Sequence, residues 1–495
     1  MVDTQAAPEE LKRLVNAVIW PGFNGRTLPE WLREELREGL AGVVYFRQNI
    51  DPDDPAQLTA LSAEIRAANP QAVIGVDEEG GSVSRLQASA GSTLPSAAML
   101  GQLDDVDLTE AAGRQLARLC LAAGINLNLA PVADVNTNPL NPVIGIRSFG
   151  SDTELVARHS AAMVRGLQSL GVSACAKHFP GHGDTVTDSH LGLPRLELEL
   201  AELRAKHLPP LSAAISNGTQ AVMTAHIVVP GLGSPEQQEL PATLNPAAGE
   251  LLRELGFHGV QITDALDMAA IRATVGSGPG AVQAMLAGAD LLCLGNPDNP
   301  GSKTDEAEYQ EVFRALVSAV SDGTLPLSTL RRAQRKVLTL AQWCENQQAK
   351  PTIPEKTIDW LSLISQACTT NAPQMPRLAE GGVQFFDLRG TQNLATGKVG
   401  NFFSTALSAY RHVEVRDREE LFNPAASNVS LVVLADSLTN SGEQFSQLEK
   451  LAEISPQAIC INAGLAPGLD PAIRTLNCFD ASRVSAQAVA QLLAG

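Results

Sequence analysis

One loop of this sequence concentrates side chains that can transfer protons. The segment 177–190 holds three of the chain's eight histidines, two aspartates and one lysine. Its proline and glycines exclude a helix, and the apolar run 171–176 before it predicts a short buried strand. Connecting loops seldom carry this much titratable chemistry. The sequence therefore predicts that a loop at a strand end supplies the proton-transfer group of an enzyme.

Asp188 and His190 lie two positions apart in this loop. In an extended or turning backbone, that spacing lets the carboxylate accept a hydrogen bond from one imidazole nitrogen and leaves the other nitrogen free to exchange protons. Because the pKa of histidine is about 6.5, the ring can protonate a leaving oxygen and then deprotonate water. The pair is a candidate acid/base dyad.

The same loop has a second interpretation as a metal site. Its possible ligands are His178, His182, Asp184, Asp188 and His190. They include an H-x-x-x-H pair, which binds zinc from one face of a helix, and the proline and glycines prevent that helix. We therefore expect no metal and no cofactor, and a metal-dependent barrel hydrolase remains an alternative that metal analysis would test.

Other polar residues follow apolar runs or flank a turn. Asp264 lies where a strand gives way to a loop, so its carboxylate is the candidate nucleophile. Asp267 falls at the start of the next helical segment, where we expect it to cap that helix or complement its dipole. Asp77 and Arg85 flank Gly80–Gly81. That turn either brings both side chains over one pocket that holds sugar hydroxyls or leaves them as a surface ion pair.

The elements that position these residues are eight short apolar runs, which alternate with segments of helical periodicity. The runs are 15–20, 42–46, 72–76, 125–131, 172–176, 221–224, 259–263 and 290–294. This alternation is typical of a (β/α)₈ TIM barrel, whose active site lies just beyond the carboxyl ends of the strands. The residues that follow the runs include Arg47, Asn49, Asp77, Asp134, Lys177, His178, His226, Asp264 and Asn296. The chemistry is therefore expected at the barrel mouth.

The length of 495 residues predicts more than one domain. We expect an α/β fold with a catalytic barrel over 1–345, which a helix around 330–341 closes. A polar linker with two prolines and a connecting helix follow over 346–372, and then a smaller α/β sandwich domain over 373–495. This second domain has no glycine fingerprint for a dinucleotide or phosphate, so we expect a role in packing or oligomerisation.

Composition limits the partners and the location. A formal charge of −18 disfavours nucleic acid and anionic membranes as partners. No apolar run approaches the roughly 20 residues of a membrane helix. The N-terminus lacks a secretory signal, and seven scattered cysteines without a CxxC pair indicate reduced thiols. We expect a cytoplasmic protein; the charge says nothing about a small neutral substrate, and the oligomeric state stays open.

Four stretches resemble motifs of glycoside hydrolase family 3. They are 76–86, 145–150, 177–190 and 262–268. The long form K-H-F-P-G-H-G-D-T-x-x-D-S-H is highly specific, and it resembles the β-N-acetylglucosaminidase branch of that family rather than the β-glucosidase branch. The resemblance covers the whole barrel and is weaker in the C-terminal domain.

The resemblance implies a bacterial, two-domain, retaining exo-β-N-acetylglucosaminidase that works without metal on muropeptide or other cell-wall fragments. By it, Asp264 attacks the anomeric carbon, and His190 with Asp188 serves as the acid/base. The residues that it implies as ligands of the terminal N-acetylglucosamine are Asp77, Arg85, Arg147, Lys177 and His178. A β-N-acetylglucosaminide phosphorylase is an alternative, because a histidine acid/base repels phosphate less than a carboxylate does.

Overall fold

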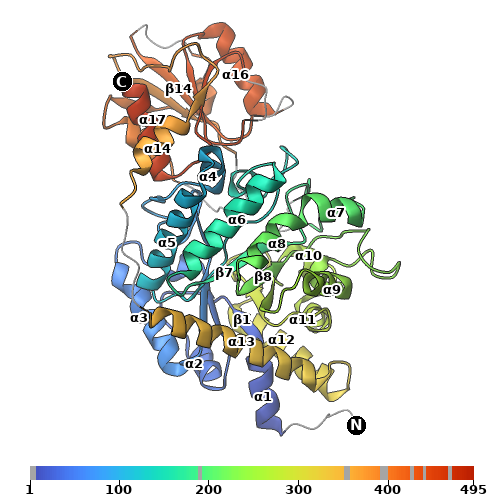
Figure 1. The fold of residues 1–495 in the computed structure, drawn as a ribbon. Helices are drawn as coiled ribbons and strands as arrows, with labels where there is room; N and C mark the ends of the chain where they lie inside the picture. The colour runs from blue at the N-terminus through green and yellow to red at the C-terminus, as the bar shows by residue number, and fades with distance from the viewer. Residues whose placement is uncertain are drawn as a thin grey trace. The chain divides into compact units, whose positions relative to one another are not determined.

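The structure is a computed structural model that describes residues 7–187, 192–350, 357–390, 400–423, 428–438, 442–466 and 471–495. It divides into two compact units (Figure 1). The first unit comprises Met1–Glu78, Val106–Val135 and Asp152–Pro354. The second comprises Glu79–Asp105, Asn136–Ser151 and Glu355–Gly495. Two segments from the predicted barrel region therefore belong to the second unit.

The first unit is an α/β fold with a curled parallel sheet, of the TIM-barrel type. Six parallel strands lie in the order β2-β3-β6-β7-β8-β9, and β1 pairs with β10 in a second parallel sheet. The strands are β1 Ile19–Pro21, β2 Gly42–Tyr45, β3 Val73–Val76, β6 Leu127–Asn128, β7 Ser173–Phe179, β8 Ala221–Thr224, β9 Val260–Thr263 and β10 Leu292–Gly295. Each of the eight predicted runs coincides with one of these strands. All eight strands are buried along their whole length, which explains why they read as continuous apolar runs.

Backbone hydrogen bonds connect the two sheets of this unit. Thr263 donates its N–H to Leu291 O over 3.0 Å, and Leu266 donates to Cys293 O over 2.9 Å, which joins the end of β9 to β10. Just before β2, Ala41 donates to Asn16 O over 3.0 Å, close to the start of β1. The strands follow one another in space in their chain order, as repeated β–α units require.

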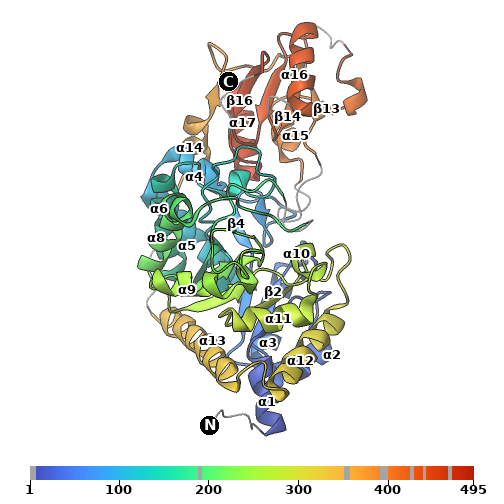
Figure 2. The same ribbon diagram turned by 90° about the vertical axis from the view of Figure 1, so that its right-hand side faces the viewer.

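Helices surround these strands (Figures 1 and 2). They are α1 Pro8–Asn16, α2 Glu30–Arg37, α3 Pro55–Ala68, α5 Val106–Ala122, α6 Thr153–Gln168, α7 Leu200–Lys206, α8 Leu208–Ser216, α9 Pro246–Glu254, α10 Ala269–Arg272, α11 Ser277–Leu286, α12 Asp305–Ser321 and α13 Leu327–Gln348. The predicted closing helix lies within α13, whose Val337, Leu340 and Cys344 pack into the core that the strands form. The last turn of α13 overlaps the start of the predicted linker.

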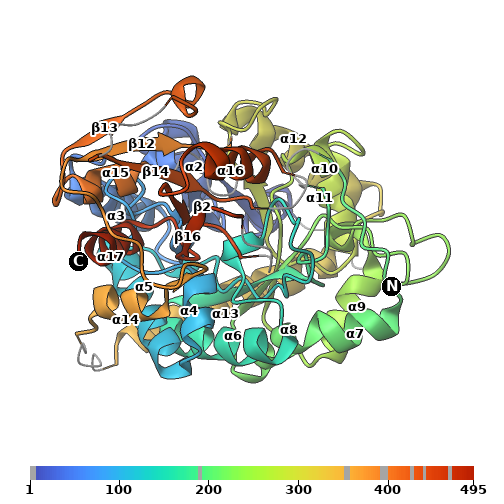
Figure 3. The same ribbon diagram turned by 90° about the horizontal axis from the view of Figure 1, so that it is seen from above.

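The second unit contains a six-stranded sheet in the order β11-β16-β15-β14-β12-β13. Its strands are β11 Thr369–Thr370, β12 Val383–Asp387, β13 Val413–Val415, β14 Ser430–Ala435, β15 Ile459–Asn462 and β16 Arg474–Asn477. Only the β11–β16 pair is antiparallel among the described strands of this sheet. The helices are α4 Ala97–Leu103, α14 Trp360–Ala367, α15 Phe402–Leu407, α16 Glu443–Ile454 and α17 Arg483–Ala494. In Figures 1 and 3, α16 lies on one side of this sheet, and α14 and α17 lie on the other.

Segment 79–105 is held within the second unit by hydrogen bonds to residues far away in the chain. Ser96 donates its N–H to Asp480 Oδ2 over 3.1 Å and its hydroxyl to Phe479 O over 2.7 Å. Val484 donates its N–H to Ser92 O over 3.3 Å. Pairings across nearly 400 residues leave no local pattern in the sequence, so the sequence did not predict this arrangement.

None of the helices in the described part of the chain has the length and apolarity that a membrane span requires.

Candidate active site

The first unit gathers charged side chains at the carboxyl ends of its strands. Lys177 lies on β7, and its Nζ is 2.7 Å from Oδ1 of Asp77, which follows β3. The lysine side chain is 2% exposed and the aspartate side chain 17%. A lysine this deeply buried requires a compensating charge, and Asp77 supplies it. Two of the predicted sugar ligands are therefore in direct contact.

His178 is oriented by a carboxylate that was not among the predicted site residues. Its Nδ1 donates to Oδ2 of Asp134 over 2.7 Å, and Asp134 is fully buried. Oδ1 of Asp134 also accepts the N–H of His178 over 3.3 Å and the N–H of His182 over 2.6 Å. Burial acts to raise the pKa of Asp134, but the facing histidines outweigh it, so this pKa lies below its usual value. The ionised carboxylate fixes the proton of His178 on Nδ1 and leaves Nε2 as the nitrogen available to a ligand.

Both Lys177 and His178 were expected in the loop after a strand, and that expectation is wrong. β7 continues to Phe179, and its pairing with β8 is irregular: Ala176 pairs with Val222 and Phe179 with Thr224. Three steps along β7 thus match two steps along β8, as in a β-bulge. A bulge interrupts the strict alternation of side chains, which explains how two consecutive residues both engage carboxylates of this site.

His182 has a structural role in the described part of the loop. It is 1% exposed, and its Nδ1 lies 2.7 Å from Oγ1 of Thr185. Burial, together with the neighbouring His178, lowers the pKa of His182 to about 4. The ring is therefore neutral at neutral pH. Within the described residues, no three His, Cys, Asp or Glu side chains converge in a way that would hold a metal ion.

Asp264, the predicted nucleophile, lies directly after β9 and is half-buried. Its N–H donates to Thr224 O over 2.9 Å, which continues the pairing of β8 with β9. Its Oδ1 accepts the N–H of Ala265 over 2.8 Å. His226 supports this turn, because its Nε2 donates to Ala265 O over 2.8 Å while its Nδ1 lies 2.9 Å from Oγ1 of Thr243. Strand pairing and a buried histidine thus fix the backbone that carries the carboxylate.

The thiol of Cys175 shows that three of these groups share one region. Burial raises the pKa of this thiol, and the charges of Lys177, Asp77 and Asp264 also act on it. The charge of Asp264 acts on His182 as well. Since such interactions fade with distance, the ammonium and the two carboxylates lie in the region of Cys175 on β7.

Arg85 and Arg147, the other two predicted ligands, belong to the second compact unit. Arg147 forms a bidentate pair with Glu79, with Nε 2.9 Å from Oε2 and Nη2 2.8 Å from Oε1, and both side chains are at most 7% exposed. Its Nη1 donates to Val143 O over 3.2 Å. Arg85 is 9% exposed. Both guanidinium groups are therefore buried, and Arg147 is held rigidly by a carboxylate.

The predicted dyad, Asp188 and His190, lies outside the described residues.

The expected capping role of Asp267 is wrong. Helix α10 has Met268 at its N-cap, without a side-chain cap, and Asp267 Oδ2 instead accepts hydrogen bonds from Asn299 Nδ2 over 3.1 Å and from Ser302 Oγ over 2.8 Å. The carboxylate fixes the loop after β10.

From the sequence, Asp134 was expected only as a polar residue that follows an apolar run, and Glu79 was given no role of its own. The structure gives each a defined partner, His178 for Asp134 and Arg147 for Glu79. The available signal was their position after apolar runs. It could not reveal which basic side chain each carboxylate would meet.

The chain is similar to several known proteins. The family model described as "Glycosyl hydrolase family 3 N terminal domain" matches residues 15–340. The β-hexosaminidase of Stenotrophomonas maltophilia (strain K279a) is 38% identical over 306 residues, which cover 60% of this chain and 86% of that protein. β-Hexosaminidase A of Pseudoalteromonas piscicida is 31% identical over 359 residues, which cover 67% of this chain and only 58% of that protein.

A solved structure extends the similarity to nearly the whole chain. The glycoside hydrolase family 3 β-N-acetylglucosaminidase from Paenibacillus sp. str. FPU-7 superposes with a TM-score of 0.84 at 30% sequence identity. The match covers 98% of this chain and 96% of that chain. The predicted family and the predicted class of enzyme, a glycoside hydrolase, are confirmed: the chain belongs to glycosyl hydrolase family 3.

Proposed function

We propose that this protein is a retaining exo-β-N-acetylglucosaminidase that releases terminal N-acetylglucosamine from cell-wall fragments such as muropeptides. The observation that carries the proposal is the group of charged residues at the carboxyl end of β7, within the part of the chain that matches the family. There Lys177 contacts Asp77, His178 contacts Asp134, and the charge of Asp264 acts on the same region. The named β-hexosaminidase relatives support the choice of sugar.

The proposed binding role follows from the hydrogen-bond geometry of these pairs. Ionised groups make the strongest hydrogen bonds to hydroxyl groups, and their partners hold them in place before the ligand arrives. Lys177 and Asp77 present an ammonium and a carboxylate side by side, and Asp134 orients the ring of His178. In the proposal, these three ligands and the buried Arg85 and Arg147 hold the terminal sugar.

The proposed chemistry uses Asp264 as the nucleophile and His190, assisted by Asp188, as the acid/base. The carboxylate of Asp264 attacks the anomeric carbon while the imidazolium of His190 donates its proton to the leaving oxygen. Neutral His190 then takes a proton from the water that attacks the glycosyl-aspartate, and this step restores both groups. Two inversions at the anomeric carbon give net retention. No metal takes part in the proposed mechanism.

The proposal includes the finer architecture and the location. We infer a closed (β/α)₈ barrel over 1–345, a connecting segment over 346–372 and a separate α/β sandwich domain over 373–495. We also infer a cytoplasmic location. All seven cysteines lie in the described part of the chain as buried free thiols, which supports a reducing compartment.

The experiment that tests the mechanism is hydrolysis of aryl N-acetylglucosaminides with good and poor leaving groups. We expect Asp264→Ala to lose activity on all of them. We expect His190→Ala to lose far less on good leaving groups, because these need little protonation. The matched controls are Asp298→Ala, an exposed carboxylate in the loop after β10, and Thr187→Ala, an exposed residue three positions before His190 in the sequence. Both controls should retain activity.

The product decides between the proposal and its rivals. The proposal requires that NMR of the first product shows the β-anomer of free N-acetylglucosamine, in phosphate-free buffer and after treatment with a chelator. Formation of a sugar phosphate at a higher rate with added phosphate would establish the phosphorylase instead. Equal losses on good and poor leaving groups in His190→Ala would remove that histidine from the acid/base role.

A further inference from the structure

The second unit contains a cavity near the point where the strand order of its parallel sheet reverses. Its five parallel strands appear in the chain as β12, β13, β14, β15 and β16, but their spatial order is β13-β12-β14-β15-β16. The chain therefore passes from β12 to β13 on one side of β12 and then from β13 to β14 on its other side. In open α/β sheets, ligands bind outside the carboxyl ends of the strands at such a switch point.

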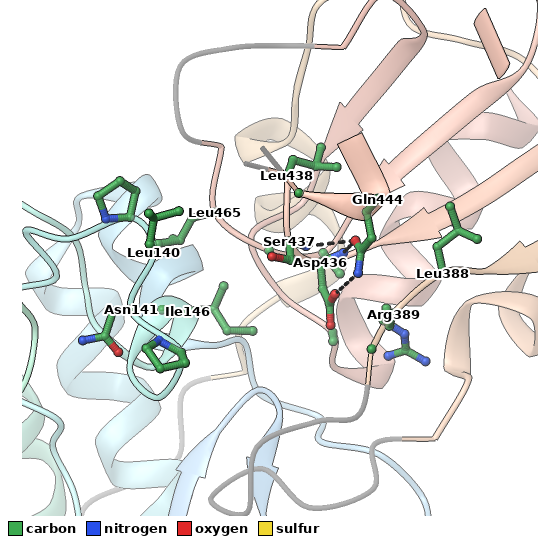
Figure 4. A pocket seen from close by; sticks show the side chains of 18 of the residues that line it. Leu140, Asn141, Ile146, Leu388, Arg389, Asp436, Ser437, Leu438, Gln444 and Leu465 are labelled. Carbon is green, nitrogen blue, oxygen red and sulfur yellow. Dashed lines mark hydrogen bonds between the residues drawn. The ribbon is translucent and has the colours of Figure 1, made fainter. Parts of the chain in front are cut away.

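The cavity has a volume of about 550 Å³, within the range of small-molecule sites. Leu388 and Arg389, which follow β12, line it together with Asp436, which follows β14. Figure 4 shows these residues and Gln444 of α16 on one side, facing Leu140, Asn141 and Ile146. Every lining residue belongs to the second unit. The two strands at the switch point thus both contribute to the wall.

Arg389 leaves a buried hydrogen-bond donor without a partner in this wall. Its side chain is 5% exposed, and its Nε and Nη2 donate to the two carboxylate oxygens of Asp387. Its Nη1 has no hydrogen-bond partner among the described residues. Leaving a buried donor of a charged group unsatisfied is costly. A ligand oxygen in the cavity would remove that cost.

Arg418 adds a positive charge at the same wall. Its Nε donates to Asp387 O over 2.7 Å, and its Nη2 donates to Arg389 O. Both acceptors are backbone carbonyls, and no carboxylate of the described residues lies within ion-pair distance of Arg418. The guanidinium thus lines the cavity without an ion-pair partner among the described residues, although its charge acts on the carboxyl group of Asp436.

Helix α16 points its N-terminus at the cavity. The helix has 12 residues, and its N-cap is Gly442, which offers no side chain to the first N–H groups. Gly442, Glu443 and Gln444 line the cavity. The N-terminus of a helix favours an anion, because its dipole and its unpaired N–H groups both point there. Three kinds of donor therefore converge: Arg389 Nη1, Arg418 and the start of α16.

Asp436 provides the complementary acceptor. Its Oδ1 accepts a hydrogen bond from Gln444 Nε2 over 2.9 Å, while Gln444 Oε1 accepts the N–H groups of Asp436 and Ser437 (Figure 4). This bidentate arrangement fixes the carboxyl group at the cavity wall. A carboxyl group held in this way selects ligands that carry hydroxyl groups as well as the anionic group.

We propose that this cavity binds a sugar-sized organic anion, with its anionic group on Arg389, Arg418 and the N-terminus of α16, and a hydroxyl group on Asp436. The anionic group is a carboxylate or a phosphate monoester. The unit lacks the glycine-rich fingerprint of a dinucleotide site, and the volume fits a ligand of one or two rings. The unit is then a binding module and not only a packing domain.

The test is calorimetric titration of the full chain, in a buffer free of phosphate and sulfate, with glucose 6-phosphate, glucuronate and glucose. We expect saturable binding of at least one of the two anions, which identifies the anionic group, and no binding of glucose. Arg147, a proposed ligand of the terminal sugar, also lines the cavity. We expect that excess N-acetylglucosamine does not displace the anion; displacement would show that the cavity is part of the hydrolytic site and would overturn the proposal. Because binding is measured without turnover, failure of this proposal can be distinguished from failure of the proposed function.

Two arginine variants give the matched comparison. Arg418→Gln should weaken anion binding about tenfold, as expected for the loss of one charge-assisted contact. Arg416→Gln removes a nearby arginine that pairs with Glu414 and Glu420 and does not line the cavity, and it should leave binding unchanged. Absence of saturable binding for both anions, equal binding of glucose, or equal losses in the two variants would each overturn the proposal.

Discussion

The Asp134→Asn variant tests whether this carboxylate controls the chemistry of His178. The two oxygens of Asp134 have different partners: Oδ1 accepts two backbone N–H groups, and Oδ2 accepts Nδ1–H of His178. Asparagine can keep its oxygen on the backbone donors, which places its NH₂ group against Nδ1. Two donors cannot face each other, so His178 must take the other tautomer. Its Nε2 then changes from an acceptor to a donor.

The expected loss of kcat/KM follows from the hydrogen bond of His178 whose donor and acceptor are exchanged in this variant. A hydrogen bond to a charged group contributes about 1.5–3 kcal/mol, which corresponds to about 10- to 150-fold in kcat/KM. Stability should change less, because both backbone N–H groups keep their acceptor in Asp134→Asn. Asp134→Ala removes all three accepted bonds from a fully buried position and should be strongly destabilised.

The assay is kcat/KM for an aryl N-acetylglucosaminide, together with urea unfolding and NMR of the His178 ring to identify its tautomer. The Asp134→Asn/His178→Gln double variant completes a thermodynamic cycle. Because Asp134 acts through His178, the double variant should be little worse than His178→Gln alone. A folded Asp134→Asn enzyme within about twofold of the wild type, or losses that multiply in the double variant, would refute this reasoning.

Two further predictions concern stability. Lys177→Met should destabilise the fold by about 3 kcal/mol, because it leaves the largely buried Asp77 without its ammonium partner. In urea unfolding, the double variant with Asp77→Asn should recover part of this loss. Fully additive losses in the two variants would contradict the pairing. The pKa of His182 is about 4 in the folded state and about 6.5 when unfolded, so protons bind the unfolded state more strongly. The contribution of His182 to the free energy of unfolding therefore falls by about 2 kcal/mol as the pH drops from about 8 to about 5. His182→Gln should lose that much less stability than the wild type over this range, and identical pH profiles would contradict the burial effect.

The strands of the first unit could be predicted because their burial is uniform. Each is a short apolar run between polar residues, and that contrast is visible in the sequence. The end of β7 was missed, because apolar character stops at Ala176 while strand pairing continues to Phe179. The pairing with β8 and the bridge from Lys177 to Val132 decide the backbone there, and neither follows from local preference.

The partners within the site were the least predictable part. The sequence placed Asp77, Lys177 and Asp264 at strand ends, and the structure gathers all three around Cys175. It did not indicate that Asp134 would meet His178, because the two residues are 44 positions apart and meet only after the sheet forms. The capping role expected for Asp267 was wrong for the same reason, because its carboxylate accepts hydrogen bonds from Asn299 and Ser302 instead.

The charged groups of the first unit support the proposed choice of Asp264 as the nucleophile. The ammonium of Lys177 is paired with Asp77, and the ring of His178 is paired with Asp134, so each of these groups already has a fixed partner. The thiol of Cys175 is fully buried, and burial raises its pKa, so it stays protonated and is a poor nucleophile. Asp264, the proposed nucleophile, is half-buried as Asp77 is, but Asp77 already faces the ammonium of Lys177. An attacking group must be both charged and reachable, and among these residues Asp264 meets both conditions best.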